Sequence, residues 1–252
     1  MELPAAGTNR LQVLRAVEEG WQAFSRAPWT FLLFQLVALL AALPFAGLAV
    51  AGALRLASQE LPDLHPIAAG IALVVGALGY VLVALWGLVG LTRSAWRSLE
   101  GQRPDFRSFS RWDGAAGGRL LLSTSVLVLV VALMGLVAAL LSAGLGRLNA
   151  VLASLPLLLF AAAYVWFLVT QKFLIQLALF AETRPLATLR AGVSGVNPSW
   201  WLVLWLAVVE TAMHAIALLF SYGGLFVIFP VMLCISTAAY RQLFGSEDRT
   251  GL

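Results

Sequence analysis

The amino-acid sequence predicts an all-α, polytopic membrane protein with six transmembrane helices arranged as three hairpins, with interfacial amphipathic elbow helices. Three observations support this prediction. Hydrophobic residues make up 61% of the 252 residues and charged residues only 11%, whereas soluble domains carry about 25% charged residues. The apolar runs are continuous rather than alternating, which favours helices over a transmembrane barrel. Short turns alternate with long arginine-rich loops, which is typical of hairpins.

The six apolar runs are each long enough to cross the hydrocarbon core of a bilayer, which takes about 20 helical residues. A turn at 142–147 separates the third and fourth runs, and a turn at 221–224 separates the last two. Tight turns of this kind predict that neighbouring spans pack as hairpins. We expect the spans at 29–53, 67–91, 120–143, 152–180, 199–220 and 223–243.

The whole chain is predicted to form one membrane domain. Small residues occur at helical spacing within it, for example Gly47 in the first span and Gly135 in the third, each followed four residues later by alanine. Such spacing predicts close helix contacts. The parts of the domain over 1–252 are a cytoplasmic amphipathic lead at 1–28, a six-span bundle at 29–243 and a cytoplasmic tail at 244–252.

Positive charge is concentrated on one side of the predicted spans. Thirteen of the fifteen arginines fall in the N-terminal lead, the second and fourth loops and the tail, whereas Arg55 and Arg147 fall on the other side. Because basic loops are retained in the cytoplasm, both termini are predicted to be cytoplasmic. These loops would rest on the anionic headgroups of the lipid bilayer. No nucleic-acid fold signature accompanies the net charge of +4, so nucleic-acid binding is not expected.

The segment 10–26 predicts an amphipathic helix that lies in the cytoplasmic interface and ends before Pro28. Aromatic and arginine-containing segments at 104–112 and 189–200 introduce the third and fifth spans in a similar way. The pattern predicts three copies of an elbow followed by a hairpin, which occurs in transporters and also in proteins that only pack helices. The apolar residues of the first elbow recur at helical spacing, namely Leu11, Leu14, Val17, Trp21 and Phe24.

Seven of the nine tryptophans are predicted to lie near the cytoplasmic boundary. An aromatic belt at the headgroup level anchors a protein in the membrane. The alternative is a contact surface for a partner, a lipid or a pigment. The candidate interfacial or partner-binding residues are Trp21, Trp29, Trp96, Trp112, Trp200 and Trp201.

Two ionisable residues lie deep in the predicted spans. Lys172 lies ten residues before Glu182, at the end of the fourth span, and Glu210 lies ten residues after Trp200, at the start of the fifth. At a rise of 1.5 Å per residue, both lie about 15 Å into the membrane. Because an isolated charge at the bilayer centre costs at least about 2.5 kcal/mol, this equal depth predicts a Lys172–Glu210 ion pair or a wet cavity.

Further polar residues surround this predicted pair. His214 lies one turn beyond Glu210 on the same helix face, and Gln171 precedes Lys172. Thr170 and Thr211 can complete the cluster. One interpretation is a relay for protons or a substrate, another is a buried polar contact that fixes helix packing, and a third is that Lys172 extends outward to the interface.

No metal, cofactor or enzymatic site is expected. Cys234 is the only cysteine, and the two histidines are far apart, so neither a disulfide nor a zinc site is predicted. The segment Gly192-Val-Ser-Gly195 matches the G-x-S-G of rhomboid-type proteases, but Ser194 falls in an elbow. If the chain between them is helical, His214 lies about 30 Å from Ser194, too far to act as its base. Nucleotide-binding and zinc-protease motifs are also missing from the sequence.

Four segments together resemble a group of bacterial six-span proteins that includes the YciC-like proteins and is similar to the membrane domain of some glycerophosphodiester phosphodiesterases. These segments are 20–29, 101–109, 189–200 and 230–245. The resemblance implies a bacterial inner membrane, or another internal membrane, as the location. The phosphodiesterase activity of such fusions belongs to a separate soluble barrel, so no catalytic residue is carried over.

Two functional hypotheses follow. The first is a non-enzymatic component, scaffold or assembly and stabilising factor of a membrane complex, with another membrane protein or a second copy of the chain as its partner. The second is a transporter or lipid-handling protein that uses Lys172, Glu210 and His214 in the middle of the membrane. The sequence itself identifies neither a substrate nor a partner.

Overall fold

The computed structural model describes residues 11–57, 66–181, 184–220 and 222–252, and every regular element in these ranges is helical. Six of the helices are long and apolar enough to cross a membrane, so the chain is a multi-pass membrane protein, as predicted. The elements are α1 (Val13–Ser25), α2 (Pro28–Ala57), α3 (Pro66–Leu99), α4 (Phe106–Ser110), α5 (Gly114–Gly146), α6 (Ala150–Thr170), α7 (Leu174–Phe180), α8 (Pro185–Val196), the short 3-10 helix η1 (Asn197–Ser199), α9 (Trp200–Phe220) and α10 (Tyr222–Phe244).

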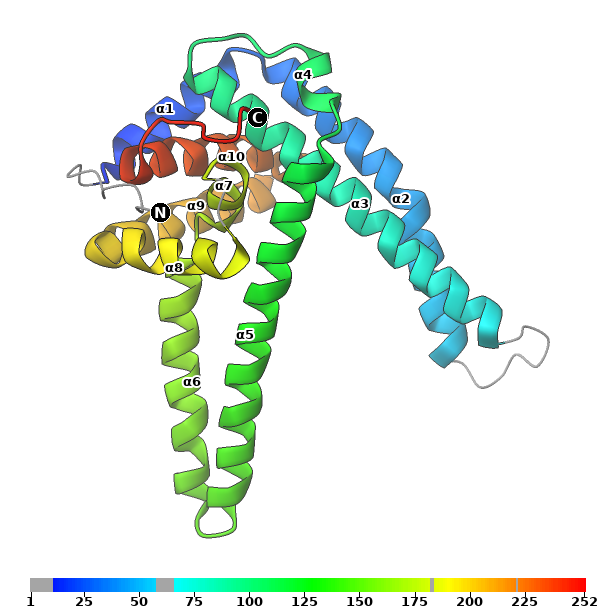
Figure 1. The fold of residues 1–252 in the computed structure, drawn as a ribbon, viewed down its shortest axis with the longest axis vertical. Helices are drawn as coiled ribbons and strands as arrows, with labels where there is room; N and C mark the ends of the chain where they lie inside the picture. Colours follow the sequence, from blue (N-terminus) through cyan, green and yellow to red (C-terminus); the bar gives the residue numbers. More distant parts are fainter. Residues whose placement is uncertain (1–10, 58–65, 182–183, 221) are drawn as a thin grey trace.

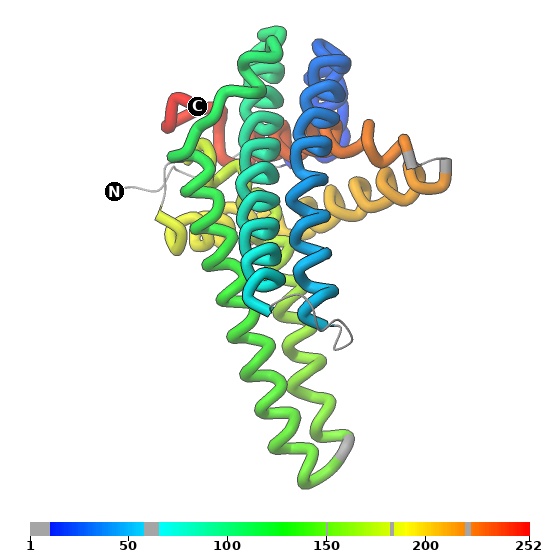
Figure 2. Tube along the Cα trace, turned by 90° about the vertical axis from the view of Figure 1, so that its right-hand side faces the viewer, coloured from blue at the N-terminus to red at the C-terminus, as the bar shows by residue number. Residues whose placement is uncertain are grey.

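The long helices pair as α2–α3, α5–α6 and α9–α10, each preceded by a shorter helix (Figure 1). The three hairpins meet at one end and diverge from there. In Figure 1 α2–α3 and α5–α6 descend at different inclinations, and Figure 2 shows α9–α10 extending sideways. We call the shared region the hub, and we call the outer parts of the hairpins the arms (the described residues of 36–84, 124–166 and 211–229).

The second half of α10 forms the centre of the hub. Every residue from Pro230 to Tyr240 is buried in the protein, although the apolar sequence of this segment is typical of a lipid-facing transmembrane helix. Helices α1, α3 and α9 all pack against α10. The approach of α1 is close, because a Cβ added at Gly20 would lie 2.5 Å from the Cα of Ile235. Glycine at this position therefore lets the first and last helices of the hub meet backbone to backbone.

Aromatic rings fill much of the remaining core. Phe31 at the start of α2 meets Phe109 of α4 edge to face, with 4.9 Å between the ring centroids. Trp96 of α3 stacks on Phe180 of α7 at 4.3 Å. Such contacts join elements that are far apart in the chain, so the hub is held by side-chain packing between helices.

Side-chain caps mark the starts of three helices. Asp105 accepts a hydrogen bond from the backbone N–H of Ser108 at the start of α4, and Asp113 accepts one from Ala116 at the start of α5. Asn149 does the same for α6. These side chains satisfy amide groups that a helix start leaves without partners.

The predicted fourth span is too long. The sequence predicted one helix over 152–180, but α6 ends at Thr170, and α7 begins at Leu174 as a separate helix. Six of the seven side chains of α7 are buried in the protein. An apolar run has the same composition whether lipid or protein covers it, so the pattern could not reveal this break.

Helix α1 also differs from its prediction. Residues predicted to share one apolar face separate, because Leu11 and Phe24 are buried in the hub, whereas Leu14 is 82% and Trp21 is 54% exposed. The protein-facing side of α1 consists mainly of small residues, which allow its close packing on α10. Arg10, the first residue of the predicted helix, lies outside the described residues.

The two longer arms pack differently. In α2–α3, a Cβ added at Gly52 would lie 2.5 Å from the backbone nitrogen of Leu73, and one added at Gly76 would clash with Ala49. In α5–α6, a Cβ at Gly135 would meet the Phe160 ring at an ordinary 3.5 Å. The predicted close contact at Gly47 is wrong, since the space beside it is open.

Candidate functional site

The predicted ion pair is present. The Nζ atom of Lys172, in the turn between α6 and α7, pairs with Oε2 of Glu210 on α9. The hydroxyl group of Ser236 on α10 donates a hydrogen bond of 2.9 Å to the other carboxylate oxygen. Glu210 is only 5% exposed, so both of its oxygens are used within the protein. Three separate segments therefore converge on one buried carboxylate.

The local sequence explains how Glu210 reaches this position. Val203 and Leu206, seven and four residues earlier on α9, are fully buried and share its helix face. Ser236 lies in the buried half of α10 next to Thr237, within an otherwise apolar run. Ser236 was not predicted from the sequence, although its position beside Thr237 in an apolar run indicates a polar contact.

The other residues predicted for this cluster do not join the pair. Gln171 donates a 3.0 Å hydrogen bond to the backbone oxygen of Leu189 on α8. The ring Nδ1 of His214 lies 3.1 Å from the backbone oxygen of Glu210, not from its carboxylate. The hydroxyl groups of Thr170 and Thr211 bond to backbone oxygens of their own helices at 2.8 Å. Of the predicted cluster, only Lys172 and Glu210 pair, and Ser236 joins them.

The continuous helix from which the depth of Lys172 was predicted is not present. That depth was counted back from Glu182, which lies outside the described residues, as if one helix ran from 152 to 180. Because α6 ends at Thr170, Lys172 lies in the turn that follows this candidate span and precedes α7. A carboxylate held by an ammonium group and a hydroxyl group is suited to fix the position of α9 and α10 against this turn.

The serine of the G-x-S-G segment makes its described hydrogen bond within its own helix. Ser194 lies on α8, and its hydroxyl donates a 3.3 Å hydrogen bond to the backbone oxygen of Ala191 in the same helix. His214 lies on α9, with its described ring contact at Glu210. A serine nucleophile needs a base within hydrogen-bond reach, and this arrangement does not supply one.

Several arginines that the sequence assigned to loops instead satisfy helix ends inside the hub. Arg93 on α3 is 1% exposed, and it donates to the backbone oxygens of Ser108 at 2.8 Å, Phe109 at 3.3 Å and Arg111 at 2.8 Å. The last turn of a helix leaves carbonyl groups without intrahelical donors, and a guanidinium group supplies several donors at once. Arg93 thus fastens the α4 elbow to α3.

Arg119 plays the same part for α7. From the first turns of α5 it donates to the backbone oxygens of Ala178 at 3.1 Å and Leu179 at 3.3 Å. The loop pattern predicts that Arg93 and Arg119 face lipid headgroups. The arginine-rich loops therefore serve the protein itself as well as any membrane surface.

The six candidate tryptophans divide into two groups. Trp29 is 81% and Trp201 is 76% exposed, Trp21 and Trp112 are each 54% exposed, and Trp200 is partly buried. Trp96 is 3% exposed, with the guanidinium carbon of Arg241 placed 4.9 Å from its ring centroid. Trp96 therefore belongs to the core and not to an accessible belt.

The described residues show no group of three or more His, Cys, Asp or Glu side chains that could hold a metal ion. Cys234 is a free thiol buried in α10. Pockets do occur around the hub: one of about 490 Å³ is lined by Trp166, Trp200 and Trp201 with Asn197, and another of about 350 Å³ is lined by charged residues of α1 and α10.

Comparison with known proteins identifies no similar protein. No family model, no curated protein and no solved structure matches the chain. The resemblance to YciC-like proteins therefore remains a prediction from the sequence, and what the chain is shown to be is a helical, multi-pass membrane protein with six candidate spans.

Proposed function

We propose that this protein is a non-enzymatic scaffold or assembly factor of a membrane complex. The observation that supports the proposal is the divergence of the three arms from one packed hub (Figures 1 and 2). A rigid centre with separated apolar arms can hold several membrane-embedded partners at fixed positions. The partner would be another membrane protein or a second copy of this chain.

The surface of the arms supports this proposal. Their large apolar side chains are exposed along both longer hairpins, so lipid or another protein must cover them. The small-residue faces of α2 and α3, by contrast, are already used within one hairpin. Examples of the exposed side chains are Leu39, Leu54, Ile71, Leu78, Leu133, Leu140, Leu158 and Leu159.

The arrangement of charge supports a cytoplasmic hub. Among the described arginines, Arg55 at the end of α2 and Arg147 at the end of α5 lie at the tips of arms, and the others lie in or around the hub. Cytoplasmic ends of membrane proteins are enriched in arginine. We extend the proposal to an inner or other internal bacterial membrane with both termini in the cytoplasm.

Photo-crosslinking in the native membrane tests the proposal. A photoreactive residue would replace Leu158 on α6 or Leu78 on α3, which are 63% and 61% exposed, and Leu177 in the hub, 2% exposed, serves as the control position. We expect one discrete protein adduct from the arm positions and none from Leu177. Native mass spectrometry should then show the crosslinked partner at a constant stoichiometry with this protein. A clean monomer with lipid adducts alone would overturn the proposal.

The alternative is a transporter or lipid-handling protein that uses Lys172, Glu210 and His214. Its support is a buried ionisable carboxylate whose partner, the Lys172 side chain, remains 23% exposed. A relay role predicts that neutralising Lys172 and Glu210 together leaves a folded protein that can no longer do its task. A packing role predicts that the same double variant folds and still forms the crosslinked complex.

A further inference from the structure

Helix α1 carries three different faces, although it is only 13 residues long. At 100° per residue, one face holds the buried residues that pack on α10. A second face, about 120° away, holds Arg15, Glu19 and Gln22, and Arg26 continues it at the C-terminal cap of the helix. The third face holds Leu14 and Trp21, two turns apart and open to the surroundings.

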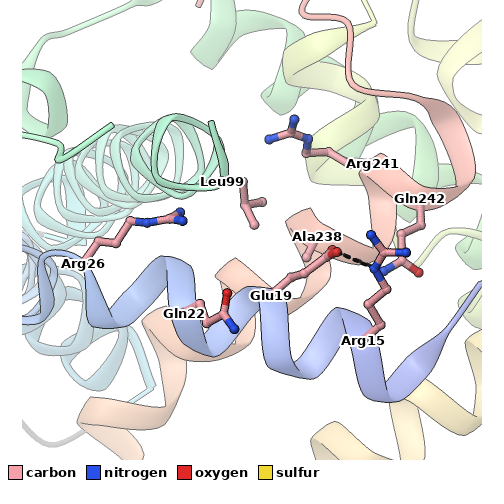
Figure 3. A pocket seen from close by; sticks show the side chains of 8 residues that line it. All are labelled: Arg15, Glu19, Gln22, Arg26, Leu99, Ala238, Arg241 and Gln242. Carbon is pink, nitrogen blue, oxygen red and sulfur yellow. Dashed lines mark hydrogen bonds and ion pairs between the residues drawn. The ribbon is translucent and has the colours of Figure 1, made fainter. Parts of the chain in front are cut away.

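The second face lines a pocket of about 350 Å³ between α1, the end of α3 and α10 (Figure 3). This volume is at the lower end of the range for small-molecule sites. Three arginines from two helices line the pocket together with two amide side chains and one carboxylate. The lining residues are Arg15, Glu19, Gln22, Arg26, Leu99, Ala238, Arg241 and Gln242.

The single carboxylate of this lining is already compensated. Glu19 accepts a hydrogen bond from Nε of Arg15 at 2.8 Å and one from Nε2 of Gln242 at 3.3 Å. In the described part of the chain, no carboxylate lies within ion-pair distance of Arg26 or Arg241. The lining residues themselves therefore carry two positive charges in excess, and Glu100 acts on Arg241 from outside the lining.

These two arginines point toward the same space. Figure 3 shows the guanidinium groups of Arg26 and Arg241 directed from opposite sides toward the region beside Leu99. Arg26 also donates to the backbone oxygen of Ser98, and Arg241 is placed over the Trp96 ring, so both side chains are held in position. The Nη1 atom of Arg241 is buried and has no hydrogen-bond partner. The remaining N–H donors of the two guanidinium groups can therefore face one ligand between them.

We propose that this pocket binds a phosphate-type oxyanion, with the phosphate of an anionic lipid headgroup as its source. A guanidinium group binds phosphate oxygens through parallel hydrogen bonds, and two groups facing each other match such a ligand from both sides. The adjoining face of α1 points to a lipid, because the exposed Leu14 and Trp21 are suited to the interfacial layer in which headgroups lie. Glu100, whose carboxylate accepts from Trp96, lies near Arg241 and favours a phosphate diester over a more highly charged anion.

Lipid binding to the purified full-length protein tests the proposal. Native mass spectrometry would compare added phosphatidylglycerol with phosphatidylcholine for the original protein, for Arg26→Gln, and for Arg26→Gln combined with Arg241→Gln. Arg190→Gln removes the same charge from the exposed surface of α8 and is the matched control. We expect the preference for phosphatidylglycerol to fall about tenfold or more in the double variant and to remain in the control.

Isothermal titration calorimetry with inorganic phosphate distinguishes free phosphate from a lipid headgroup as the source of the ligand. The protein could bind phosphate through Arg26 and Arg241 and yet show no preference for phosphatidylglycerol. This result would contradict the proposal that a lipid headgroup supplies the phosphate. An equal loss in Arg190→Gln, or no loss in the double variant, would overturn the site itself. Arg241→Lys keeps the charge over Trp96 but not the paired donors, so weakened lipid binding in this folded variant supports the site. The scaffold proposal rests on the arms and does not depend on this outcome.

Discussion

The hub and the arms both contain long apolar runs, but different surroundings cover them. Leu177 in the hub is 2% exposed, whereas Leu158 in the α5–α6 arm is 63% exposed. The hub buries polar and charged side chains against backbone oxygens, as Arg93 does. The arms depend on hydrogen bonds within each helix, which is what lipid surroundings require. Composition alone therefore identifies a helix that avoids water, but not whether protein or lipid covers it.

Two contacts in the hub and two in the arms test this difference between the regions. If the hub resembles the core of a soluble protein, loss of a buried donor should be costly there. If the arms are solvated by lipid, they should be sensitive only where two backbones meet. The free energy of unfolding of the detergent-solubilised protein is the quantity to compare.

The largest effect is expected for Arg93→Leu. The change leaves the backbone oxygens of Ser108, Phe109 and Arg111 without this donor, and we expect a destabilisation of about 3 kcal/mol or more. Denaturant or thermal unfolding followed by circular dichroism measures it. Arg190→Leu, the same substitution on the exposed face of α8, should stay within about 0.5 kcal/mol. Equal effects of the two variants would mean that the hub is not a packed core.

An intermediate effect is expected for Glu210→Leu. It leaves the ammonium group of Lys172 without its carboxylate, and we expect a loss of about 2 kcal/mol, at the low end for buried pairs because the Lys172 side chain is 23% exposed. Combining it with Lys172→Met should recover most of the loss in a double-mutant cycle. If the double variant is less stable than either single variant, the two side chains stabilise the fold by more than the neutralisation of each other's charge.

The smallest effect is expected in the arms, and its sign should differ between the two hairpins. Gly76→Ala places a Cβ against the backbone of Ala49 and should cost about 1–2 kcal/mol. Gly135→Ala meets the Phe160 ring at 3.5 Å and should be neutral or stabilising by about 0.5 kcal/mol, because alanine favours a helix. Disulfide crosslinking between α2 and α3 would show whether that hairpin opens. A stabilised Gly76→Ala variant would mean that the two backbones are not in close contact.

The sequence was most informative about the arms. The six spans, their pairing and the shorter helices before each pair follow from apolar length, turn residues and charge, and the structure contains them. The Lys172–Glu210 pair was also predictable, because an isolated charge in an apolar run requires a partner. The break after Thr170 was not predictable, because α7 is as apolar as a span but is buried in the hub.

The hub was much less predictable. Arg93 sits in a basic loop pattern, but its guanidinium group is used by oxygens fifteen and more residues away. Trp96 looked like a member of an interfacial belt because it is close in sequence to exposed charges, yet it stacks on Phe180. Both roles depend on long-range contacts, and local spacing contains no information about these.

The position of α10 at the centre of the hub has a consequence for the order of assembly. The hairpins α2–α3 and α5–α6 are synthesised before α10, and each can enter the membrane as a unit. Helix α1, however, has its packing surface on α10, more than two hundred residues later in the chain. The packing face of α1 therefore has no α10 to contact until most of the chain has been translated. Contacts of such long sequence separation form slowly, so the arms are expected to be in place before the hub that joins them is complete.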